Sequence, residues 1–146
     1  MNYITISKFA ITMLILDYIY LSTVSSNYND LLLKIQNKPL KLKPIYALVV
    51  YIIMTVGWTL LILLKNKKYS LSNNVINSII LGIVIYGVFD FTNLAIFNNY
   101  SLTIALIDVL WGGVLFGISS YVALRWIHWN MKNHYQSNRV LGSAPP

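Results

Sequence analysis

Cysteine and glutamate are both absent from this chain of 146 residues, and charged residues make up only 10% of it. Without cysteine, disulfides, thiolate zinc sites and cysteine nucleophiles are excluded. Soluble domains carry about a quarter charged residues, whereas here hydrophobic residues reach 57%. A water-soluble fold this apolar would expose large hydrophobic patches and aggregate. The composition therefore favours a protein embedded in a lipid bilayer.

Four long apolar runs account for most of the chain, at residues 4–24, 45–64, 75–97 and 102–124. Each run is about 20 residues long, and a helix of that length crosses a hydrocarbon core of about 30 Å. Pro44 is suited to open the second run, and Ser101 to cap the fourth. Asn73 and Asn74 are the expected caps of the third. The pattern predicts an all-α, polytopic membrane protein with four transmembrane helices in an antiparallel bundle, over residues 1–126.

The segments between and after the runs are more polar. Residues 27–43 interleave leucines with lysines and are too short and too charged to span. We interpret them as a short interfacial segment between helices one and two, and an ordinary polar loop fits nearly as well. Residues 98–101 form so short a link that helices three and four must be antiparallel neighbours. Residues 127–146 are expected to form a polar C-terminal tail, partly disordered.

The formal charge of +7 comes from basic residues scattered through loops and tails. Nucleic-acid binding needs a clustered basic face, so no nucleic-acid partner is expected. Four spans place both termini on one side, and basic residues are in excess there. The excess predicts that both termini are cytoplasmic. The terminal side holds Lys8, Lys65, Lys67, Lys68, Arg125, Lys132 and Arg139, and the other side holds Lys34, Lys38, Lys41 and Lys43.

All four acidic residues are aspartates, and Asp17, Asp90 and Asp108 fall inside the predicted helices. A charged aspartate at the centre of a bilayer costs about 2.5 to 3.5 kcal/mol on insertion scales. No lysine or arginine lies at the depth of these three residues. Helices one and three run one way and helix four runs back, so all three aspartates fall on the side of the midplane away from the termini. We therefore expect them to form one polar layer.

Polar and aromatic neighbours support a shared site. Tyr86, Asp90 and Asn93 are spaced i, i+4, i+7 and lie on one helix face. Trp111 shares a face with Asp108. The 14% of aromatic residues is otherwise interpreted as interfacial belt and packing. The candidate site residues are Asp17, Asp90, Asp108, Tyr86, Thr92, Asn93 and Trp111.

Three functions remain open for this layer. In the first, the carboxyl groups cluster and bind or translocate a proton or cation; in the second, they hydrogen-bond helices together in a structural or accessory membrane protein. The third alternative is an intramembrane enzyme. It is less favoured because no nucleophile–base pair, phosphate loop or metal-ligand motif appears, so we expect no catalytic residue, metal site or cofactor. A single four-helix chain has little room for its own pore, so a pore between the subunits of a homo-oligomer is favoured.

Two blocks of sequence resemble a known family. Residues 86–95 read Tyr-Gly-Val-Phe-Asp-Phe-Thr-Asn-Leu-Ala, and residues 107–112 read Ile-Asp-Val-Leu-Trp-Gly. They resemble the Y-G-x-Y-D-x-T-N-L-A and D-x-x-W-G blocks of the predicted membrane-protein family called domain of unknown function 2177, with Phe89 where a tyrosine is common. The resemblance implies four spans and an early membrane aspartate, which Asp17 matches. It implies a topology and a site location but no activity.

Overall fold

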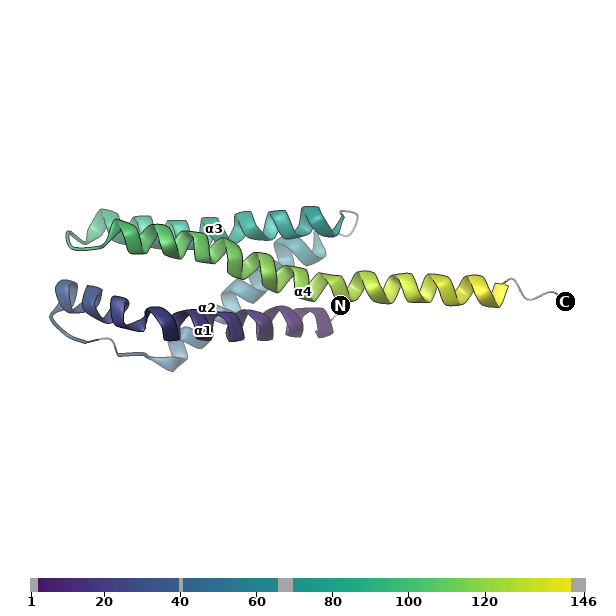
Figure 1. Ribbon diagram of the computed structural model, residues 1–146, viewed down its shortest axis with the longest axis horizontal. Helices are drawn as coiled ribbons and strands as arrows, with labels where there is room; N and C mark the ends of the chain where they lie inside the picture. Colours follow the sequence, from purple (N-terminus) through teal and green to yellow (C-terminus); the bar gives the residue numbers. More distant parts are fainter. Residues whose placement is uncertain (1–2, 40, 66–69, 143–146) are drawn as a thin grey trace.

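The computed structural model describes residues 3–39, 41–65 and 70–142, with side chains as far as Trp126. These residues form helices and no strand. Four helices are long and apolar enough to cross a membrane, which confirms the predicted fold class. The elements are α1 (Tyr3–Gln36), α2 (Pro44–Trp58) with its π-helical continuation η1 (Thr59–Leu64), α3 (Leu71–Ile96) and α4 (Leu102–Gly142). α1 and α3 run in one direction and α2 and α4 return, so the α1–α2 and α3–α4 links lie at one end of the bundle (Figure 1). We call these two the helix–helix links; the start of α1 lies at the opposite end.

The first helix is longer than the sequence analysis predicted. Residues 27–36 continue α1 instead of forming a separate interfacial segment, and Asp30 is an exposed helical residue and not part of a loop. No glycine or proline interrupts α1, and the helix ends where Asn37 adopts a left-handed backbone conformation with φ of 54°. At 1.5 Å per residue α1 is about 51 Å long, more than the thickness of a hydrocarbon core. A helix of this length is therefore longer than a single untilted span requires.

The other helix ends follow local chemistry. Pro44 opens α2 as predicted, and the Ser101 hydroxyl accepts a hydrogen bond from the Ile104 amide at 3.4 Å, which confirms the predicted cap of α4. The cap of α3 was predicted wrongly. Ser70 occupies that position and accepts from the Asn73 amide, because the helix begins at Leu71, before the two asparagines.

The backbone of α4 continues as a helix beyond the apolar run. The apolar run predicted from the sequence ends at residue 124, but α4 extends to Gly142. No glycine or proline lies between these two residues to break it. The last part of α4 therefore projects past the bundle (Figure 1).

The α3–α4 pair forms the most extensive helix contact, through glycines. A Cβ atom added to Gly82 would overlap the backbone carbonyl of Gly112. A Cβ atom added to Gly112 would lie 2.5 Å from the ring of Tyr86. The two backbones can approach this closely only because neither residue has a side chain, as in other small-residue crossings of membrane helices.

The apolar core is centred on Trp58 at the end of α2. Its ring stacks on Phe9 of α1, with ring centroids 4.0 Å apart, and Phe9 in turn meets Phe116 of α4 edge-on. The Trp58 indole N–H donates to the hydroxyls of Ser78 and Ser120 at 3.1 and 3.2 Å. This buried N–H is therefore satisfied, as a polar group inside a membrane protein must be. The contacts tie the end of α2 to the other three helices.

The glycine crossing generates a paired prediction. Gly82→Ala forces α3 and α4 apart, so we expect the free energy of unfolding to fall by at least about 1 to 3 kcal/mol. Gly57→Ala on α2 is the matched control, because nothing lies within 4 Å of the added Cβ. It should leave the melting temperature unchanged or slightly higher. Thermal unfolding of both variants in the same detergent checks this, and equal melting temperatures would contradict the proposed close contact.

Candidate functional site

The three intramembrane aspartates are all buried, with exposed fractions of 7% for Asp17, 0% for Asp90 and 6% for Asp108. Asp90 lies six residues before the end of α3 and Asp108 six residues after the start of α4, so both are about 9 Å along the helix axis from the α3–α4 link. Asp17 lies opposite Trp111, about one turn deeper. All three residues occupy the half of the bundle nearer the helix–helix links.

A reciprocal set of contacts joins α1 to α4. The Tyr20 hydroxyl of α1 donates to Asp108 Oδ1 of α4 at 2.7 Å, and the Trp111 indole N–H of α4 donates to Asp17 Oδ1 of α1 at 2.9 Å. The two aromatic rings stack between these bonds, with centroids 4.4 Å apart. Each helix thus supplies an aspartate and, three residues later, an aromatic donor for the aspartate of the other. We call these four residues the aspartate–aromatic clasp.

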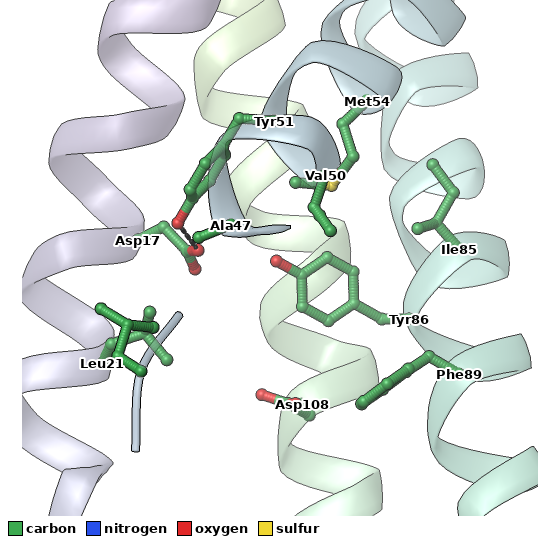
Figure 2. Close-up of a pocket in the computed structure, with 11 residues that line it drawn as sticks. Asp17, Leu21, Ala47, Val50, Tyr51, Met54, Ile85, Tyr86, Phe89 and Asp108 are labelled. Atoms are coloured by element: carbon green, nitrogen blue, oxygen red, sulfur yellow. Dashed lines mark hydrogen bonds between the residues drawn. The ribbon is translucent and has the colours of Figure 1, made fainter. Parts of the chain in front are cut away.

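Tyrosines from the other two helices complete the surroundings. The Tyr51 hydroxyl of α2 donates to Asp17 Oδ2 at 2.6 Å, so both oxygens of this carboxyl group are bonded. Tyr86 of α3 directs its hydroxyl into the space between Asp17 and Asp108 (Figure 2). Among the described residues this hydroxyl has no hydrogen-bond partner. It is therefore placed to bond a guest.

A cavity of about 470 Å³ lies between the helices at this point. Asp17 and Asp108 face it together with Tyr51 and Tyr86 (Figure 2). The rest of its wall is apolar and comprises Leu21, Leu42, Ala47, Val50, Met54, Ile85 and Phe89. A mostly apolar cavity with a few converging polar groups is the usual form of a ligand site.

Asp90 occupies a separate environment. Tyr100, in the α3–α4 link, donates to Asp90 Oδ1 at 2.7 Å. The other oxygen, Oδ2, is buried and has no partner among the described residues. Burial, and then the hydrogen bond to Asp90, raises the pKa of Tyr100 above its ordinary value, so the hydroxyl keeps its proton and remains a donor at neutral pH.

The structure divides the sequence-derived candidates. Asp17, Asp108, Tyr86 and Trp111 meet around or beside the cavity. Asp90 lies outside the set of residues that line it. Asn93 is half-buried beside Tyr100. Thr92 is exposed on the outer face of α3.

The tyrosine donors were missed by the sequence analysis. Tyr20, Tyr51 and Tyr100 were assigned to packing or to an interfacial belt, yet each donates to a buried aspartate. One signal was available, because Tyr51 lies well inside an apolar run, at a depth where its hydroxyl needs an acceptor. Tyr20 follows Asp17 by three residues on the same helix, yet its hydroxyl bonds Asp108 of α4.

The chemistry of the site follows from its acceptors. Within the described part of the chain, no lysine or arginine forms an ion pair with Asp17, Asp90 or Asp108, so the positive charge that would balance a carboxylate is not built in. No group of three or more potential metal-ligating histidine, aspartate or glutamate side chains occurs there. The site can therefore accept a proton or a positively charged guest.

The clasp generates a second prediction. Tyr20→Phe keeps the ring that stacks on Trp111 and removes only the donor to Asp108, so stability should fall by about 1 to 3 kcal/mol. Tyr18→Phe is the control on the same helix, because Tyr18 is 74% exposed; its effect should stay within about 0.5 kcal/mol. Denaturant unfolding in detergent micelles measures both. A Tyr20→Phe variant as stable as Tyr18→Phe would show that this hydrogen bond does not hold α1 to α4.

Comparison with known proteins identifies the family of the chain. No curated protein and no solved structure matches the chain. The family described as predicted membrane protein (DUF2177) matches residues 2–125, a range that includes every aspartate and all of the four spans except Trp126. The earlier resemblance, on two sequence blocks, is thereby confirmed over most of the length. The chain belongs to the DUF2177 family of predicted membrane proteins.

Proposed function

We propose that this membrane protein binds a proton or a cation at Asp17 and Asp108, as the first step of translocation. The observation that carries the proposal is that two buried carboxyl groups from different helices face one cavity. Carboxyl groups inside a membrane helix bundle are costly, and they typically mark ion or proton pathways. A cavity between them gives a guest space to reach both.

The polarity of the surroundings supports a positive guest. Tyr20, Tyr51 and Trp111 donate to the two carboxyl groups and orient them without contributing positive charge. In a medium of low dielectric constant, the interaction of a carboxylate with a nearby cation is much stronger than in water. A proton bound to either aspartate would neutralise its negative charge as a cation does.

On this proposal, Asp90 is a second group that can bind the proton along its path. It lies at the depth of Asp108 on the neighbouring helix and has one buried oxygen without a partner among the described residues. Its other oxygen contacts Tyr100 in the α3–α4 link. Chains of carboxyl and hydroxyl groups are the usual components of proton relays in membrane proteins.

A structural role is the second candidate. Every hydrogen bond that Asp17 and Asp108 accept from an aromatic donor joins two different helices. Such bonds between membrane helices contribute roughly 0.6 to 2 kcal/mol each. On this alternative, the aspartates hold the bundle of an accessory protein together and no guest is bound.

Flux measurements separate the two candidates. Asp17→Asn and Asp108→Asn each keep one acceptor oxygen but cannot carry negative charge, so proton or potassium flux into liposomes should be lost. The new amide N–H at position 17 can donate to the Tyr51 hydroxyl, so the melting temperature should change little. Asp30→Asn, on the exposed end of α1, is the matched control and should retain full flux. Flux that survives in the double Asp17→Asn, Asp108→Asn variant would refute the transport mechanism. If no flux is found and Leu at either site lowers the melting temperature, the structural role is favoured instead.

We also propose that the termini are cytoplasmic and that the working unit is a homo-oligomer. The native absence of cysteine makes orientation easy to measure, because one introduced cysteine is the only thiol. Asn37→Cys lies in the α1–α2 link and Ser72→Cys at the opposite end of the bundle. A membrane-impermeant maleimide added to intact cells should label the first and leave the second unlabelled until the cells are permeabilised. The reverse pattern would invert the topology.

A further inference from the structure

We infer that the guest of the cavity is an organic ammonium ion that carries an apolar body. This inference rests on the proposed function of the Asp17–Asp108 site and names the class of ligand. It follows from three features of the cavity: its size, its wall and its opening.

The size and wall of the cavity match an organic molecule. A volume of about 470 Å³ lies in the range of roughly 300 to 1,000 Å³ that is typical of sites for small organic ligands. Aliphatic side chains and Phe89 make up most of the lining, and the carboxyl groups and two tyrosines supply its polar part. An amine with an apolar body could bury that body against the aliphatic wall and place its charge beside the acids.

The donor set does not resemble a cage for an inorganic ion. A hard cation such as calcium takes about six to eight oxygen ligands, and both oxygens of Asp17 already accept hydrogen bonds. The cavity offers three aromatic rings instead, from Tyr51, Tyr86 and Phe89. A positive ammonium group is attracted to the faces of such rings. Carboxyl groups and aromatic rings together are suited to an ammonium ion.

The cavity also opens sideways. Three of its lining residues are half exposed or more: Leu42 at 69%, Val50 at 50% and Phe89 at 58%. η1 packs against α3, whereas α2 itself packs against α1, so the walls on α2 and α3 separate towards the helix–helix links. In a membrane, this opening faces lipid. A hydrophobic amine that partitions into the bilayer can therefore enter without crossing water.

Equilibrium binding with a matched pair of probes tests the inference. The full-length protein in nanodiscs of phosphatidylcholine is titrated with 4-phenylbutylamine and with 4-phenylbutanol, which has the same apolar body and no charge. Empty nanodiscs give the background from lipid partitioning. We expect the amine to bind saturably and at least about tenfold more tightly than the alcohol, since hydrogen bonds to charged groups are the stronger class.

Two kinds of variant localise the binding. Asp108→Asn should weaken amine binding roughly 10- to 100-fold, and Asp30→Asn should leave it unchanged. Phe89→Ala should weaken amine binding several-fold without unfolding the protein, because Phe89 is exposed and outside the core. Dodecylamine is added in the same assay as a competitor of 4-phenylbutylamine. Tighter binding of dodecylamine indicates a lipid-like amine as the ligand, and tighter binding of 4-phenylbutylamine indicates a compact one.

The outcomes separate this inference from the proposed function. Equal binding of the amine and the alcohol, or amine binding that survives Asp108→Asn, would overturn the organic-cation assignment. If amines do not bind but Asp-dependent proton or potassium flux is present, the assignment is wrong and the proposed function stands. If Asp-dependent flux and amine binding are both absent, both are wrong.

Discussion

The hydrogen bonding of carboxyl groups in a lipid environment is the constraint on which this structure depends. A buried aspartate in a membrane helix needs donors, and water is not available to supply them. Here the donors come from the opposite helix, with Tyr20 bonded to Asp108 and Trp111 to Asp17. Since each aspartate and its aromatic residue are three positions apart, the two bonds form together only when α1 and α4 are antiparallel in one register. The clasp therefore selects the pairing as well as stabilising it.

The cavity follows from how α2 is attached at its two ends. Near the helix–helix links, Tyr51 reaches across to Asp17; near the termini, Trp58 packs on Phe9 and bonds two serines. These attachments leave the space beside Tyr86 and Phe89 unfilled by any side chain of α2. The contacts that satisfy the acids and the contacts that shape the cavity are thus largely the same. A substitution that breaks a hydrogen bond to Asp17 is therefore expected to change the shape of the cavity as well.

Hydropathy and loop length were sufficient to predict the spans, their antiparallel order and the half of the bundle that holds the aspartates. These properties depend on position along the chain. The tyrosine donors depend on rotation about each helix axis, and the apolar runs gave no strong face to define it. Tyr51 illustrates this, because its partner lies on a different helix 34 positions away. The sequence also failed to predict that α1 ends at Gln36, because a charged helical extension and a polar loop have the same composition.

The two acids do not offer a guest the same opportunity. Each oxygen of Asp17 already accepts one hydrogen bond, from Trp111 or from Tyr51, so a guest that bonds Asp17 must share that oxygen with a donor. Tyr20 occupies one oxygen of Asp108, and the Tyr86 hydroxyl points into the space nearby (Figure 2). A positive group should therefore bind first between Asp108 and Tyr86, with Asp17 acting through its charge. Loss of the Tyr51–Asp17 bond would release one end of α2 from α1 while Trp58 kept the other end stacked on Phe9, which would couple occupancy of the cavity to movement of the helix that borders its opening.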